Sequence, residues 1–93
     1  MLRLNCFISV DRDKKEQVLE AAKRLTVASL KQDGCVAYDI FESATRPEVM
    51  MICETWRDKA ALDAHSASEV FKEEVGIMEQ HAKLKIEVFN FGD

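Results

Sequence analysis

Residues 2–10 read Leu-Arg-Leu-Asn-Cys-Phe-Ile-Ser-Val, and the fold can be derived outward from this stretch. The apolar residues on one face are Leu2, Leu4, Cys6, Ile8 and Val10. The alternate positions are Arg3, Asn5, Phe7 and Ser9. A period of two predicts a β-strand. Its second face mixes polar and aromatic side chains, which suits a cavity wall or an interface better than open solvent.

The next segment has helical periodicity. Apolar residues recur at helical spacing after Asp13, which predicts a helix over about 14–32. Asp13 is a candidate N-cap because Glu16 follows three residues later, as in a capping box. Gly34 is the expected stop signal after the helix.

The rest of the chain supplies three more strands and a second helical region. Residues 35–43 and 49–56 read as strands joined by a turn at 44–48, so they are expected to form an antiparallel hairpin. Asp58 is expected to cap a short helix that is interrupted at 66–68. Ser68 begins a further helix with a single apolar stripe, and 83–91 alternate again as a fourth strand.

The resulting order, βαββαβ, predicts an α+β fold of the ferredoxin-like type. Right-handed crossovers place the first and third strands at the centre of a four-stranded antiparallel sheet, with the helices on one face. The other face is left bare and carries apolar side chains, which normally indicates a partner. Two such sheets packed face to face would form a dimeric α+β barrel, so we expect a homodimer through the sheet faces.

Length and composition restrict the classes of function. The chain has 93 residues and is expected to form one domain over 1–93. Its net charge of −4 argues against nucleic acid, and no apolar run approaches the roughly 18 residues of a membrane span. No signal peptide is visible after Met1. Neither membrane nor nucleic acid is therefore an expected partner.

The cysteines and histidines predict neither a disulfide framework nor a metal site. Cys6, Cys35 and Cys53 are odd in number and lack a CxxC spacing, which favours reduced thiols in a cytoplasmic protein. His65 and His81 have no third ligand near them in the sequence. We therefore expect no metal ion and no cofactor.

One ordered set of residues carries a family resemblance. It reads Glu54-x-Trp56-x-Asp58-x-x-Ala61-Leu62-x-x-His65-x-x-Ser68-x-x-Phe71, and Gly34-Cys35 and Tyr38 precede it. This set resembles the antibiotic biosynthesis monooxygenase family, which includes small quinol monooxygenases. The resemblance implies a dimeric α+β barrel that oxidises a small aromatic quinol or phenol with O₂, without metal or flavin. It also implies a cavity between sheet and helices near Asn5, Phe7, Trp56 and His65.

The candidate catalytic residues are His65, Asn5 and Trp56. His65 has a near-neutral intrinsic pKa and could act as a base, or it could instead tether the helix interruption. Asn5 could orient a substrate oxygen or bond to a neighbouring chain. Trp56 could stack on an aromatic ligand or belong to the core.

The candidate substrate-binding residues are Phe7, Tyr38 and Phe71. Tyr38 could donate to a substrate oxygen, or pack under a helix with its hydroxyl at the surface. Glu54, at the end of a central strand, is expected to be held in a salt bridge rather than to take part in catalysis.

Three other functions compete with a quinol monooxygenase. A haem-degrading oxygenase of the same barrel type would use Asn5, Trp56 and His65. An isomerase of a phosphorylated signal would need a cationic pocket, for which Arg3, Arg57 and Lys72 are the basic residues available. The fourth function is a non-catalytic ligand-binding barrel.

One departure from the family pattern weakens the monooxygenase interpretation. Many members have a second His before the Phe, where this chain reads Ser68-Glu69-Val70-Phe71.

Overall fold

A computed structural model describes residues 1–92, so Asp93 of the expected domain lies outside the described residues. The chain forms four strands and three helices. They are β1 (Leu2–Val10), α1 (Lys15–Ser29), β2 (Cys35–Glu42), β3 (Val49–Trp56), α2 (Lys59–Ser66), α3 (Glu69–His81) and β4 (Ala82–Asn90). The second helical region is thus split into α2 and α3, as its interruption at 66–68 predicts.

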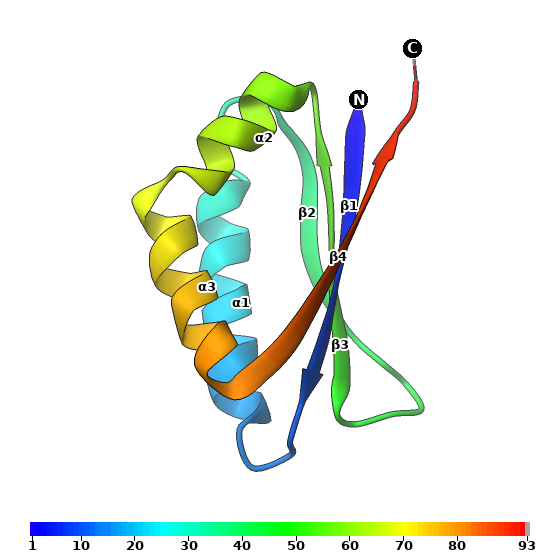
Figure 1. Cartoon of the computed structure of the whole chain (residues 1–93), viewed down its shortest axis with the longest axis vertical. Coiled ribbons are helices and arrows are strands. Elements are labelled where there is room, and N and C mark those ends of the chain that lie inside the picture. The colour runs from blue at the N-terminus through cyan, green and yellow to red at the C-terminus, as the bar shows by residue number, and fades with distance from the viewer. Residues whose placement is uncertain (93) are drawn as a thin grey trace.

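The sheet has the expected ferredoxin-like topology. Its strand order is β2-β3-β1-β4, with β1 and β3 at the centre and every neighbouring pair antiparallel. Figure 1 shows all three helices on one face of this sheet and the other face uncovered. Both termini lie at one end, where the Phe91 N–H donates to the Met1 carbonyl over 2.9 Å. Within residues 1–92, no helix is both long and apolar enough to cross a membrane.

The alternation of β1 decides which side chains enter the core. Leu4, Cys6, Ile8 and Val10 are buried under the helices, whereas Arg3, Phe7 and Ser9 are exposed on the helix-free face. The register carries the same division across the sheet, because paired residues of neighbouring strands point to the same side. Cys6 pairs with Ile52 on the helix side, and Asn5 pairs with Cys53 on the opposite side.

Helix α1 differs from the sequence prediction at both ends. It ends at Ser29, whereas the periodicity predicted an end near 32. Residues 30–33 instead form turns, which direct the Gln32 side chain toward α2. The prediction of Asp13 as N-cap is wrong: Lys14 occupies that position without a side-chain cap, because the chain enters α1 through a turn whose backbone is already helical.

The start of α2 is fixed by a cap and by a close approach of the backbone. The Asp58 carboxylate accepts from the Ala61 N–H over 2.9 Å, as predicted. Gly34 has φ +82°, a conformation that favours glycine. A Cβ at this position would overlap the Cβ of Ala61. Gly34 therefore lets the segment after α1 pass directly against α2.

The helix-free face carries an apolar row. Phe7, Met51 and Phe41 lie side by side across β1, β3 and β2 through their register pairs. Phe7 and Phe41 are 38% and 50% exposed. The prediction of a bare, partly apolar sheet face is confirmed within residues 1–92.

Candidate functional site

A small cavity, here called the inner cavity, lies between the sheet and the helices. The volume of the inner cavity is about 80 Å³. One water molecule needs about 10–15 Å³ on this measure, so the inner cavity can hold several. Most of its wall is apolar, and its polar side chains include Glu54, His65 and Tyr38. Ile86 of β4 lines it while remaining 55% exposed, so the inner cavity reaches solvent beside the edge strand.

Glu54 is the main correction to the site predicted from sequence. A salt bridge was expected, but none of the ion pairs within residues 1–92 brings a Lys or Arg to this carboxylate, which is only 6% exposed. The Trp56 indole N–H donates to Glu54 Oε1 over 2.9 Å. Burial raises the pKa of Glu54 to about 7, although the hydrogen bond from Trp56 and the nearby Tyr38 hydroxyl lower it. Glu54 therefore exchanges a proton near neutral pH.

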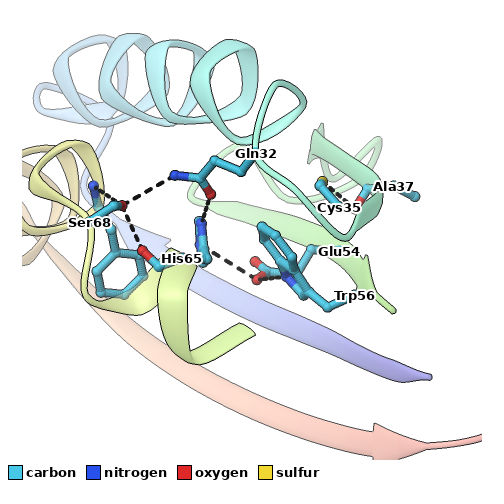
Figure 2. Close-up of polar contacts among 8 residues, drawn as sticks. Gln32, Cys35, Ala37, Glu54, Trp56, His65 and Ser68 are labelled. Atoms are coloured by element: carbon cyan, nitrogen blue, oxygen red, sulfur yellow. Dashed lines mark hydrogen bonds and ion pairs between the residues drawn. The ribbon is translucent and has the colours of Figure 1, made fainter. Parts of the chain in front are cut away.

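The protonation of His65 follows from the bonds around it (Figure 2). The Ser68 hydroxyl donates to the His65 carbonyl over 2.6 Å, so the Ser68 oxygen must accept from the Gln32 amide NH₂ at 3.3 Å. The Gln32 carbonyl oxygen then faces His65 Nδ1 at 2.7 Å. A carbonyl only accepts, so Nδ1 carries the hydrogen.

The other ring nitrogen of His65 is consequently an acceptor. Burial alone lowers the pKa of His65 to about 4, so its imidazole is neutral at pH 7. The side chain is 1% exposed, and Nε2 is buried without a hydrogen-bond partner in residues 1–92. Nε2 lies 3.8 Å from Glu54 Oε1, too far for a hydrogen bond. His65 was expected to act either as a base or as a tether of the helix interruption, and its bond to Gln32 is of the tethering kind.

The aromatic candidates divide between core and cavity wall. Trp56 is fully buried and its ring lies 4.4 Å from that of His65, between centroids. Phe71 lines the inner cavity and meets the His65 ring edge-on at 5.0 Å. Tyr38 also lines the cavity, but its side chain is buried, so the expectation of a surface hydroxyl is wrong. Burial and the adjacent Glu54 raise the pKa of Tyr38, which keeps this phenol protonated.

Asn5 and Phe7 do not share a cavity with His65. Both project from the helix-free face, since they alternate with Leu4 and Cys6, which line the inner cavity. The expectation of one cavity near Asn5, Phe7, Trp56 and His65 is therefore wrong. The period of two identifies residues that share a face, but it does not say which face the helices cover. The haem-degrading alternative loses its basis too, because it needs Asn5 beside His65.

The charges near the inner cavity do not suit a phosphorylated ligand. None of the described residues that line it is a Lys or Arg. Arg57 lies outside and is paired with Asp33 and Asp58. Within residues 1–92, no group of three or more His, Cys, Asp or Glu is placed to hold a metal ion. The Cys6 thiol lines the cavity, and burial raises its pKa to about 11.

Two functional positions were not assigned from the sequence. Glu54 could have been found from its spacing, because it shares a strand face with Trp56 and no basic residue alternates with it on β3. Gln32 gave no signal, since it was expected within the helix.

Glu54 and His65 together place a titrating carboxylate and a neutral imidazole acceptor in an apolar, partly closed space. Such a site can bind an aromatic hydroxyl and accept its proton away from bulk water.

The chain is similar in sequence to a known family and to named relatives. Residues 1–75 match the family model described as "Antibiotic biosynthesis monooxygenase". The chain is 31% identical over 72 residues to YcnE of Bacillus subtilis, which is described as a "Putative monooxygenase". The match covers 77% of this chain and 76% of that protein.

A second curated relative and a solved structure extend the likeness. The Synechocystis protein sll1783 is 31% identical over 83 residues, which are 85% of this chain but 56% of that protein's length. A conserved Bacteroides thetaiotaomicron protein, described as a "Possible Oxidoreductase", is 49% identical with a TM-score of 0.96. That match covers 97% of this chain and 96% of the other.

Proposed function

Because this chain belongs to the antibiotic biosynthesis monooxygenase family, we propose that it oxidises a small aromatic quinol or phenol with O₂ and needs no bound cofactor. The observation that carries the proposal is Glu54, a buried carboxylate with a pKa of about 7 that faces an apolar cavity. A group that titrates near the working pH is well matched to general base catalysis.

The chemistry needs a proton acceptor and a dry site. Ionised Glu54 takes the proton from a substrate hydroxyl, which leaves an electron-rich phenolate beside O₂ in the inner cavity. A hydroquinone with a free ring C–H and O₂ then give a hydroxyquinone and water. The substrate supplies all four electrons, and one oxygen atom enters the ring while the other leaves as water. Apolar walls such as Phe71 limit the access of bulk water to the reactive anion.

The test is O₂ consumption with a panel of hydroquinones, catechols and phenols, corrected for autoxidation in buffer. We expect turnover by the wild-type protein and a loss of roughly 10²–10⁴-fold in kcat for Glu54→Gln, as for removal of a general base. Glu73→Gln, an exposed change on α3, is the matched control. A panel that gives no rate above buffer would overturn the proposal and favour a ligand-binding barrel without turnover.

The helix-free face is the second part of the proposal. We expect two copies to pair through their sheets, because the apolar row of Phe7, Met51 and Phe41 is otherwise left in water. Phe41→Glu should shift the sedimenting species toward monomer. Val27→Glu, which replaces an equally exposed apolar residue on α1, should leave the assembly unchanged. A wild-type protein that sediments as a monomer would contradict this expectation.

A further inference from the structure

Two acceptor atoms of residues that line the inner cavity face each other. Glu54 Oε1 already accepts from the Trp56 indole N–H and keeps a further lone pair, whereas His65 Nε2 has no hydrogen-bond partner within residues 1–92. Glu54 Oε1 and His65 Nε2 are 3.8 Å apart, and both residues line the cavity. The Gln32 carbonyl accepts from the single N–H of the neutral His65 ring, at Nδ1, so Nε2 offers a lone pair. A buried acceptor without a donor costs free energy, and a ligand that supplies the donor recovers it.

We propose that the inner cavity selects an aromatic ring with two neighbouring hydroxyls, one donating to Glu54 and the other to His65. The proposal rests on the function proposed above and narrows its substrate class. A single hydroxyl has one hydrogen and can satisfy one acceptor only. Adjacent hydroxyls lie on the same side of the ring, and each can donate over the roughly 2.5–3.0 Å of a hydrogen bond from a hydroxyl. They therefore span two acceptors 3.8 Å apart, each at bonding distance.

Other arrangements of donors fit less well. The hydroxyls of para-hydroquinone lie on opposite sides of the ring, so only one reaches the acceptor pair. An ortho-quinone presents two carbonyls, which accept but do not donate. The site therefore favours the reduced diol over its oxidised form, and a dione product is bound more weakly than the substrate.

The surroundings of the acceptor pair suit a single ring. Phe71 and Leu62 contribute apolar wall beside His65. The volume of about 80 Å³ is below the roughly 150 Å³ of a closed apolar cavity that binds benzene, so a single ring fills the inner cavity and reaches its opening. Substituents can extend only past Ile86, where the inner cavity reaches solvent. Tyr38 stays protonated and adds a polar hydroxyl near Glu54, without a competing charge.

Anaerobic binding tests the proposal without turnover. The chain has a single Trp, and Trp56 donates to Glu54, so its one indole N–H resonance reports on the acceptor pair. Titrations are run at about pH 8, above the pKa of Glu54 of about 7. We expect catechol to bind roughly tenfold more tightly than its monomethyl ether or para-hydroquinone, as one further hydrogen bond predicts. Benzylamine is included because one ammonium group could bridge both acceptors.

Every outcome of these titrations either supports or overturns the proposal. In Glu54→Gln the advantage of catechol should fall to within about twofold, and Glu73→Gln should retain it. Wild-type affinities for the three phenols within twofold, or tighter binding of benzylamine, overturn the proposal even where a variant fails to fold. Selective catechol binding without O₂ consumption would refute the proposed function but support this inference. If catechol and para-hydroquinone bind equally and are both turned over, the proposed function is supported and this inference is refuted.

Discussion

Replacing either member of the Glu54–His65 pair should expose a pH dependence of folding stability that the wild-type protein largely hides. Burial shifts the two groups in opposite directions: it raises the pKa of Glu54 and lowers that of His65. Glu54→Gln keeps an oxygen for the Trp56 indole to donate to, so it removes the titration with little change of shape. His65→Gln removes the other titration.

The magnitude for Glu54 follows from its pKa in the two states. The unfolded value is 4.5 and the folded value about 7, so the folded protein disfavours the ionised carboxylate. Stability is therefore unaffected below pH 4.5 and declines as the pH rises toward 7. At about 1.4 kcal/mol for each pH unit, the decline reaches about 3 kcal/mol. The wild-type protein carries this cost at pH 7 and Glu54→Gln does not.

His65 acts in the opposite direction. Its pKa falls from 6.5 to about 4 on folding, so stability is complete above pH 6.5 and is lost as the pH falls toward 4. The loss also amounts to about 3 kcal/mol. Between pH 4.5 and 6.5 the pair binds about one proton in either state, on Glu54 when folded and on His65 when unfolded. The two slopes therefore nearly cancel in the wild-type protein.

Urea denaturation at fixed protein concentration, repeated across the acidic to neutral range, measures these differences. The free energy of unfolding of Glu54→Gln minus that of wild type should rise by about 3 kcal/mol between pH 4.5 and 7. The same difference for His65→Gln should fall by about 3 kcal/mol between pH 4 and 6.5. Glu73→Gln, an exposed substitution on α3, is the control for the loss of one carboxylate. A flat curve for Glu54→Gln would mean an ordinary carboxyl and would refute its assignment as the base.

Three further predictions follow from the contacts around this pair. Gly34→Ala should lower the free energy of unfolding by about 2–4 kcal/mol in chemical denaturation, since its positive φ and the overlap with Ala61 both oppose a side chain; a loss under about 1 kcal/mol would contradict this. Ser68→Ala should cost about 1 kcal/mol in the same assay through loss of the α3 N-cap, and an unchanged midpoint would show the cap to be dispensable. Gln32→Leu should move the His65 hydrogen from Nδ1 toward Nε2, which ¹⁵N imidazole shifts report; unchanged shifts would mean that Gln32 does not set the tautomer.

The fold was predictable because its signals are local. The alternation of 2–10, the caps at Asp58 and Ser68, and the hairpin of 35–56 each follow from neighbouring residues, and together they lead to one topology. The exit from α1 was not predictable in the same way. Residues 30–32 remain compatible with a helix by composition, and the turn there is stabilised by contacts of Gln32 with His65 and Ser68, which are more than thirty residues away.

The site was only half predictable for a related reason. His65 and Phe71 were found from their spacing and do line one cavity, whereas Asn5 and Phe7 were assigned to it from the wrong face of the sheet. For Glu54 the residue type was evident from the sequence, but its partner was not. A carboxylate at a strand end is expected to meet a cation. Whether one lies opposite depends on α2 and β2, which only the assembled structure brings together.

The opposing pKa shifts bear on why such a pair should lie in the middle of this domain. At pH 7 the ionised Glu54 alone lowers stability by about 3 kcal/mol, in a class of domain whose total is about 5–15 kcal/mol. The Trp56 indole and the nearby Tyr38 hydroxyl offset only part of the burial of this carboxylate, since no Lys or Arg within residues 1–92 pairs with it. His65 Nε2 adds a second cost, because it is buried without a donor. An apolar pair of similar volume at these positions of β3 and α2 would give more stability. A ligand that donates to both atoms would return part of the lost free energy and should raise the unfolding midpoint. The site is thus unfavourable as packing and favourable as a binding site, which is the usual relation between stability and function.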